Sequence, residues 1–198
     1  MEIRPLQRAE FAPASRLLGR AFDHDPVIGS LWADGRRRRY AFPALFRSAM
    51  HDLVGSGSLF GAFDDGVLLA AAVWQPPTSE PSHTVRSRAN VLWLRALFPR
   101  ATPEVFAMFE RLGHLHPDRP HWYLAFVGVD PHTQSRGIGA RLLAPVHERA
   151  DAEGVACYLE TPFARTHPFY ERLGYTVREE LRPLATDAPL WTMLREPQ

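Results

Sequence analysis

Residues 126–143 constrain the fold more than any other stretch, because they join an apolar run, a proline turn, two closely spaced glycines and an amphipathic segment. The run at 123–129 is rich in β-branched and aromatic residues, which predicts a buried strand. Asp130 and Pro131 end it, since proline fixes its own φ and restricts the preceding residue. Apolar residues then recur at helical spacing from Leu142 to Ala150, which predicts a helix over 137–153.

The glycine-bearing turn between this strand and this helix predicts an anion site. The first N–H groups of a helix have no intrahelical partner, and the helix dipole places partial positive charge there. Gly137 and Gly139 let the backbone approach an anion closely, and Arg136 and Arg141 add charge. We therefore expect a phosphate or pyrophosphate to bind the backbone of residues 136–141.

Two common phosphate-binding loops do not fit this turn. A dinucleotide fingerprint needs a third glycine where Leu142 stands, and a Walker loop needs a lysine, whereas all 23 basic residues are arginine. The remaining pattern, Gln134-x-x-Gly137-x-Gly139, resembles the acetyl-CoA loop of the GNAT N-acetyltransferase superfamily. Residues 168–175, Pro-Phe-Tyr-Glu-Arg-Leu-Gly-Tyr, resemble the helix of that family that ends in Tyr-Glu-x-x-Gly-Phe/Tyr. Within the family, the segment 142–175 is most similar to the puromycin-acetyltransferase-like branch.

The resemblance implies the fold class and the cofactor. It implies one α/β (α+β) domain over 1–198, with a mixed, mostly antiparallel central sheet, two splayed parallel strands and flanking helices. The parallel strands would be 123–129 and 155–160, followed by a helix at 166–173 and strands at 174–181 and 190–194. Acetyl-CoA would bind between the splayed strands, where Gly128 is expected to permit a bulge or a close approach. The implied cofactor-binding residues are Phe126, Val127, Gly128, Val129, Gln134, Ser135, Arg136, Gly137, Ile138, Gly139, Ala140, Arg141, Thr166 and Tyr170.

The same resemblance implies the catalytic groups. Tyr170 stands where a tyrosine of the family often donates a proton to the coenzyme A thiolate as general acid, and core packing is its alternative role. The central strand carries no acid, although many relatives have a glutamate there. Glu160, at the carboxyl end of the next strand, is therefore the preferred general base, with His121 and His24 as alternatives. Thr166 stands where many relatives carry an asparagine that touches the cofactor, and it is expected to cap the following helix.

The first half of the chain predicts an edge strand at 2–6, helices at 7–22, 27–32 and 36–53, and a hairpin of strands at 58–63 and 67–74. Two more helices are expected at 85–98 and 103–114. In the family, the segment between the first two helices commonly lines the acceptor pocket; a capped helix break with core aromatics is the alternative. The implied substrate-binding residues are Phe22, Asp25 and Trp32. His121, which opens the central strand, is a further substrate-binding candidate at the edge of the site, with packing against Trp122 as its alternative role.

Composition argues against several function classes. The net charge of +1 gives no case for nucleic acid, and the arginine run at 36–39 is typical of a solvated helix surface. No apolar run reaches membrane-spanning length and no signal peptide is evident, so we expect no membrane partner and a cytoplasmic location. The single cysteine excludes a disulfide within the chain. No metal is expected, because a second ligand cluster is missing beside His114, His116, Asp118 and His121.

The leading hypothesis is an enzyme that moves an acetyl group from acetyl-CoA to a primary amine of a small molecule by direct attack. Two alternatives stay open: acetylation of a protein amine, and a non-catalytic acyl-CoA sensor that keeps the fold. Release of free thiol from acetyl-CoA in the presence of an amine separates the enzyme from the sensor. A monomer and a homodimer are both compatible with the sequence.

Overall fold

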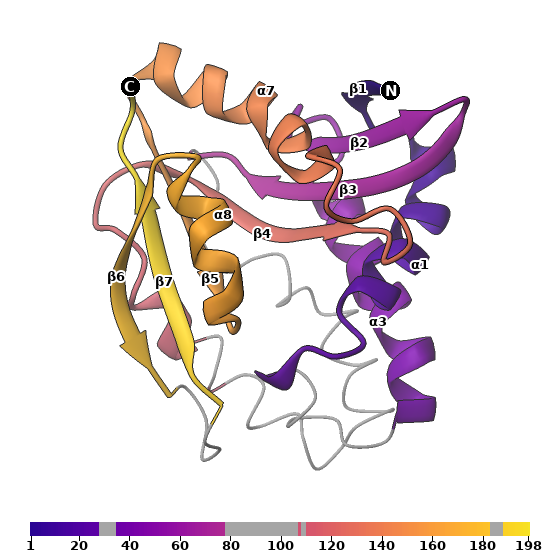
Figure 1. Ribbon diagram of the computed structural model, residues 1–198, viewed down its shortest axis with the longest axis horizontal. Coiled ribbons are helices and arrows are strands. Elements are labelled where there is room, and N and C mark those ends of the chain that lie inside the picture. Colours follow the sequence, from indigo (N-terminus) through magenta and orange to yellow (C-terminus); the bar gives the residue numbers. More distant parts are fainter. Residues whose placement is uncertain (28–34, 78–106, 108–109, 183–187) are drawn as a thin grey trace.

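The computed structural model describes residues 1–27, 35–77, 107, 110–182 and 188–198 (Figure 1). The helix expected at 85–98 and residues 28–32, Trp32 included, lie outside the described residues. Of the helix expected at 103–114, the structure describes 107 and 110–114, and 107 and 110–113 are helical. The remaining elements agree in type and order with those that the sequence predicts.

A seven-stranded sheet with the order β1-β2-β3-β4-β5-β7-β6 forms the centre of the described structure. Neighbouring strands are antiparallel except β4 and β5, which are parallel. The predicted mixed, mostly antiparallel sheet is therefore confirmed. In chain order the strands are β1 (Glu2–Pro5), β2 (Leu59–Asp64), β3 (Val67–Gln75), β4 (His121–Val129), β5 (Ala156–Thr161), β6 (Tyr175–Leu181) and β7 (Leu190–Arg195).

Helices cover both faces of the sheet, and alternate residues of β3 show how. Ala71 and Val73 belong to a core cluster with α1 (Phe11–Ala21) and α3 (Gly35–Asp52), as expected for a strand buried on both sides. Ala72 and Trp74 belong to the opposite cluster, with α7 (Ile138–Glu153) and α8 (His167–Glu171). Figure 1 shows α8 in front of β5 and α7 beside β2 and β3. Of the described helices, none is both long and apolar enough to cross a bilayer.

Element boundaries differ from the predicted ones around two turns. The helix expected at 7–22 begins as a 3-10 turn, η1 (Arg8–Glu10), and becomes regular only in α1. The helix expected at 166–173 is shorter: η2 (Ala164–Thr166) precedes α8, and Gly174, at φ +88°, leads into β6. A left-handed residue at this point ends a helix, and glycine adopts it without strain. α7 continues through Pro145.

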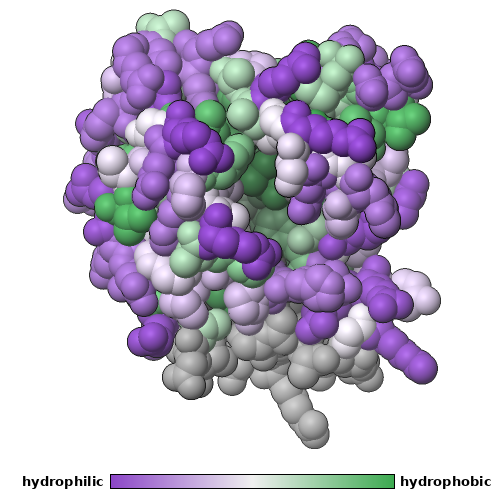
Figure 2. Space-filling view, viewed as in Figure 1, coloured by the Kyte–Doolittle hydropathy of each residue, from purple (hydrophilic) through white to green (hydrophobic). Residues whose placement is uncertain are grey.

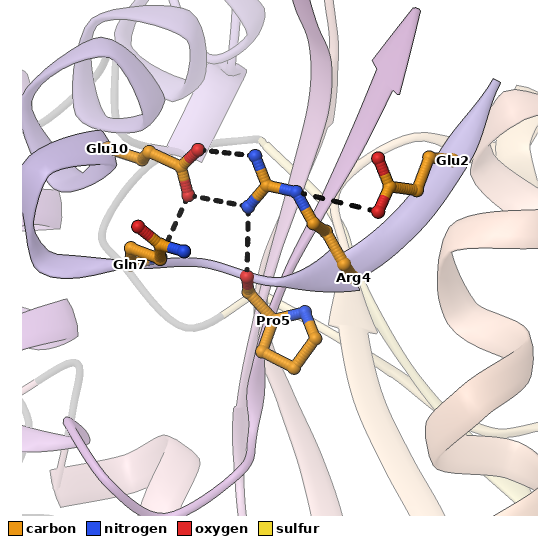
Figure 3. Close-up of polar contacts among 5 residues, drawn as sticks. All are labelled: Glu2, Arg4, Pro5, Gln7 and Glu10. Carbon is orange, nitrogen blue, oxygen red and sulfur yellow. Dashed lines mark hydrogen bonds and ion pairs between the residues drawn. The ribbon is translucent and has the colours of Figure 1, made fainter. Parts of the chain in front are cut away.

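The start of the chain is tied to the turn that precedes α1 (Figure 3). The Arg4 guanidinium lies 2.6 and 2.9 Å from the two carboxylate oxygens of Glu10, and Glu10 also accepts the Gln7 N–H at 2.8 Å. The hydrogen bond from Arg4 lowers the pKa of Glu10. These contacts join β1 to the beginning of α1, the helix that packs over β4.

Candidate active site

β4 and β5 are paired only at their beginnings. Parallel pairs join His121 to Ala156, Trp122 to Cys157 and Tyr123 to Tyr158, and the two strands share no pair after these, although both continue. From residue 124 onward, the edge of β4 that faces β5 therefore has no strand partner. Figure 2 shows a hollow with an apolar floor over the middle of β4, between α8 and the turn before α7. The splayed parallel strands that the sequence implies are present.

A bulge accompanies the split, and of the two roles expected for Gly128, a bulge or a close approach, the structure has the close approach. Val73 pairs with Phe126 and Trp74 with Leu124, so Ala125 is the extra residue of β4. Gly128 instead provides a close approach to α1, because a Cβ there would lie 2.8 Å from the Cβ of Ala21.

The other predicted cofactor-binding residues of β4 are half-buried. The Phe126 ring packs against Phe22 and Phe46, with ring centroids 6.1 and 4.9 Å away. Val127 and Val129 lie on the opposite face of the sheet, against the cluster that contains α7. The strand therefore contributes its side chains to both cores, which leaves its backbone edge as the part available to a ligand.

The turn before α7 is open. Gly137 occupies the N-cap with φ +71°, and a Cβ there would meet nothing within 4 Å. The first helical bond runs from the Arg141 N–H to the Gly137 carbonyl at 3.3 Å. In the described part of the chain, the backbone N–H groups of residues 136–140, which include Ile138 and Ala140, have no hydrogen-bond partner. A helix start of this kind is suited to an anion.

Gly139 has a packing role beside the turn. A Cβ at this position would lie 3.2 Å from Cζ of Phe169 on α8. Its small size therefore lets the first turn of α7 sit against α8, the helix that carries Tyr170.

The polar residues of the turn differ in what they contact. Gln134 and Ser135 are exposed, and the Gln134 side-chain amide donates to the Val129 carbonyl at 3.3 Å. Arg136 is exposed at the helix start, whereas Arg141 donates to the Met1 carbonyl at 3.3 Å. Arg136 is therefore the better placed of the two arginines to add charge.

A contact from α1 holds the beginning of this turn. Arg20 Nη2 lies 2.6 Å from Asp130 Oδ2. The other carboxylate oxygen of Asp130 accepts the His132 N–H at 3.1 Å, and its carbonyl accepts the Thr133 N–H at 2.8 Å. The hydrogen bond from Arg20 lowers the pKa of Asp130.

Tyr170 lies on the α7 and α8 side of the sheet. It is 7% exposed, and its ring packs against Phe169 and Tyr175 at centroid distances of 4.9 and 5.7 Å. Burial raises the pKa of its hydroxyl, which therefore stays protonated at neutral pH. It belongs to the same core cluster as Ile138, the first residue of α7.

Thr166 does not cap α8 as expected. It stands at the N-cap, but its side chain makes no capping hydrogen bond. Its hydroxyl donates to the Phe163 carbonyl at 2.7 Å and lies 2.9 Å from the Thr161 hydroxyl. These bonds close the turn from β5 to α8, so the competing local partner explains the missing cap.

Glu160 lies on the opposite face, two residues beyond the last parallel pair. Its side chain is 7% exposed, and Oε1 lies 3.5 Å from His116 Nε2. Burial raises its pKa to about 7, although the nearby hydroxyls of Tyr123 and Tyr158 lower it. Within the described residues, Glu160 Oε1 and the Tyr158 hydroxyl are buried without a hydrogen-bond partner.

Two histidines, His116 before β4 and His121 at its first position, extend this cluster. His121 is 7% exposed. Its Nε2 lies 2.9 Å from Nδ1 of His116, and its Nδ1 lies 2.8 Å from the Arg119 carbonyl oxygen. Sequence reasoning considered His116 only as a metal ligand; its place beside Glu160 depends on how the segment before β4 folds back. In the described part of the chain, no group of three or more histidine, cysteine, aspartate or glutamate side chains is arranged to hold a metal ion.

The remaining acceptor-side candidates lie at the end of α1 and beside β4. Phe22 follows α1 and packs on Phe46, at a centroid distance of 5.3 Å, while Asp25 is buried. A pocket of about 250 Å³ borders the start of β4. Its lining comes from the end of β3, the segment before β4 and the first residues of β4, and it includes His116, His121 and Tyr123.

The fold defines an α/β protein whose central sheet splits between two parallel strands, beside a glycine-bearing helix start. The sequence model of the acetyltransferase (GNAT) family matches residues 26–175. The chain therefore belongs to the GNAT family, which confirms the predicted family and enzyme class. Assignment to the puromycin-acetyltransferase-like branch stays a prediction.

Individual relatives agree with this assignment. An uncharacterised N-acetyltransferase of Schizosaccharomyces pombe is 34% identical over 84 residues, which cover 41% of this chain and 34% of the relative. The chain thus matches about a third of that protein's length. The crystal structure of histone acetyltransferase HPA2 and related acetyltransferase from Corynebacterium glutamicum gives a TM-score of 0.77 at 24% identity, covering 99% of this chain and 96% of that one. Polyamine N-acetyltransferase of Drosophila melanogaster gives 0.60 at 18% identity, covering 98% and 99%. At these identities, the two structures establish the fold.

Proposed function

We propose that this protein transfers an acetyl group from acetyl-CoA to a primary amine of a small molecule. The observation that carries the proposal is the free edge of β4 next to an open helix start, at the place where the sheet splits. The unbonded amides of residues 136–140 suit the diphosphate of coenzyme A, and the edge of residues 126–129 suits its pantetheine arm. When bound, acetyl-CoA supplies an activated acyl group.

The two proposed catalytic side chains belong to opposite faces of the sheet. Tyr170 is in the cluster of α7 and α8, and Glu160 is in the cluster of Tyr123 and Tyr158. A sheet is open to both faces only where neighbouring strands part, so cofactor and acceptor would meet at the split. This placement supports one role for Tyr170, on the side of the cofactor, and another for Glu160, on the side of the acceptor.

Their protonation states suit those roles. A carboxyl group whose pKa is about 7 is partly ionised at neutral pH, so Glu160 can accept a proton from the ammonium form of the acceptor. The Tyr170 hydroxyl stays protonated and can donate to the leaving sulfur. The amine must lose its proton before it can attack, which is why a base is needed on the acceptor face.

A small acceptor is favoured by the size of the pocket at the start of β4. About 250 Å³ is below the volume of a typical drug-sized site, so the pocket suits a small amine. Solved structures with this fold include a polyamine and an arylalkylamine N-acetyltransferase as well as a ribosomal-protein-alanine N-acetyltransferase, so the fold is compatible with small amines and the pocket carries the choice. We assign Phe22, Asp25 and His121 to the acceptor side.

The test is release of free thiol from acetyl-CoA with a panel of polyamines, arylalkylamines, short aliphatic amines and a peptide with a free N-terminus. We expect turnover with at least one small amine and little with the peptide. Turnover confined to the peptide would favour a protein acceptor. Acetyl-CoA binding without thiol release for any amine would favour the sensor, and absence of acetyl-CoA binding would overturn the proposal.

A further inference from the structure

A chain of three contacts leads from a backbone carbonyl to Glu160. The Arg119 carbonyl lies 2.8 Å from His121 Nδ1, and His121 Nε2 lies 2.9 Å from His116 Nδ1. His116 Nε2 then faces Glu160 Oε1 at 3.5 Å. The His116 and Tyr158 rings pack with centroids 4.6 Å apart, which places the imidazole beside the carboxyl group.

The carbonyl at one end determines which nitrogen carries the proton in both rings. A carbonyl oxygen only accepts, so His121 Nδ1 must carry hydrogen. In neutral His121, Nε2 is then an acceptor, and His116 Nδ1 must donate to it. In neutral His116, Nε2 is left with a lone pair, and this lone pair faces Glu160. Hydrogen-bond logic alone therefore sets the tautomer of both histidines.

Both rings are neutral at physiological pH. Burial and the neighbouring His121 lower the pKa of His116 to about 4, and burial also lowers the pKa of His121. His116 therefore does not pair with the Glu160 carboxylate as a cation. It can only accept a hydrogen bond from the protonated carboxyl group, since its lone pair repels the ionised one.

Two other groups around Glu160 act in the opposite sense. The Tyr123 hydroxyl from β4 and the Tyr158 hydroxyl from β5 favour the ionised carboxylate. Across the strand pair, β7 places the neutral Thr192 opposite Glu160, and Glu179 of β6 acts on the Tyr158 hydroxyl. Among the described residues, His116 is thus the neighbour whose nitrogen favours the protonated form.

We propose that His116 is a positioning residue that stabilises protonated Glu160, and that His121 and the Arg119 carbonyl hold it in the required tautomer. The role of His116 does not depend on the proposed function. Only its consequence rests on that function, namely that the histidine pair sets the pH at which Glu160 becomes a competent base. The separation of 3.5 Å between Nε2 and Oε1 shortens to a hydrogen bond when a proton lies between them.

Two measurements on the free protein test the proposal without any acceptor. In the ¹⁵N spectrum of histidine-labelled protein at pH 7, we expect His116 and His121 to carry hydrogen on Nδ1, and hydrogen on Nε2 of His116 would overturn the proposal. Infrared titration then follows the carbonyl band of protonated Glu160, identified by its loss in Glu160→Gln. His121→Phe frees His116 to present an N–H to the carboxylate, so this band should titrate about one pH unit lower.

The matched control is His51→Phe, on the exposed end of α3, which should leave the band unchanged. A Glu160 titration that is the same in His121→Phe and in the wild type would overturn the proposal. The pH dependence of kcat/KM separates this outcome from failure of the base role. If the band shifts while the acidic limb of the activity profile does not, Glu160 is not the base, but the role of His116 stands.

Discussion

At the scale of single residues, burial sets the protonation state of the two side chains that we propose as catalytic. It raises the pKa of the Tyr170 phenol, which stays protonated, and it raises the pKa of Glu160 to about 7, where the group exchanges protons readily. Both effects have the same cause, since a low-polarity environment disfavours the charged form of each group. The role that we propose for each side chain rests on the face of the sheet on which it lies.

Replacing Tyr170 by Phe removes the hydroxyl and keeps the packing against Phe169 and Tyr175. If Tyr170 is the general acid, kcat should fall about 100-fold or more, while KM for acetyl-CoA changes little. Tyr40→Phe, at a position of α3 that is 81% exposed, should leave both constants unchanged. Steady-state kinetics of thiol release checks this, and wild-type turnover in Tyr170→Phe would leave Tyr170 with a packing role alone.

At the scale of elements, α7 has a left-handed glycine at each end, but only one of these ends lies at the proposed site. Gly137 at its start and Gly154 at its end have φ of +71° and +65°, and a Cβ at either would meet nothing within 4 Å. The left-handed conformation costs a residue with a side chain about 1 kcal/mol. Only Gly137 lies at the proposed diphosphate site.

We therefore expect Gly137→Ala and Gly154→Ala to lower the free energy of unfolding by similar amounts, about 1 kcal/mol each. Gly137→Ala alone should weaken acetyl-CoA binding, because a methyl group enters the space over the amides. Urea unfolding and calorimetric titration of acetyl-CoA measure the two effects. Equal affinity of both variants for acetyl-CoA would contradict an anion site at the start of α7.

A second element-scale contact joins α1 to the turn before α7. Replacing Arg20 by Ala frees the Asp130 carboxylate, and the turn should lose part of its order. We expect KM for acetyl-CoA to rise about two- to five-fold with kcat unchanged, as suits a partly exposed ion pair. Arg16→Ala removes an equally exposed charge one turn earlier on the same helix. An equal effect in Arg16→Ala would mean that only overall charge matters.

At the scale of the whole molecule, a buried polar network fastens the last strand to α7. Arg195, 4% exposed, donates to both carboxylate oxygens of Asp151 at 2.6 and 2.7 Å. Nearby, His147 Nε2 lies 2.9 Å from the Tyr175 hydroxyl. Burial lowers the pKa of His147 to about 4, so the folded protein keeps this histidine neutral.

This network makes the protein sensitive to acid. Unfolded histidine takes up a proton near pH 6.5, whereas folded His147 does so only near pH 4, so the unfolded state binds more protons between these values. The free energy of unfolding should therefore fall as pH drops from about 6.5 toward 4. His147→Gln should reduce the slope of the unfolding free energy against pH by an amount that corresponds to up to about one bound proton, and His132→Gln, at an exposed position, should not. Urea unfolding at several pH values measures the slope; an unchanged slope in His147→Gln would contradict the assignment.

Much of the fold could be predicted because its signals are local. The strand, proline turn and helix between residues 123 and 153 depend on side-chain periodicity and on glycines close in sequence, and the structure has them within a residue or two. The bulge at Ala125 carried no such signal. Gly128 predicts a bulge or a close approach, and the structure has the close approach, to Ala21, more than a hundred positions away in the chain.

The sequence by itself determined the family, the element order and the turn at Gly137, because backbone propensity and hydrophobic periodicity act over a few neighbouring residues. Only the tertiary structure decided that Glu160 is buried beside His116, and that Arg20 reaches Asp130. Desolvation and hydrogen bonding depend on which atoms surround a group after the chain has packed. Such surroundings come from segments far apart in sequence, so no local pattern contains them.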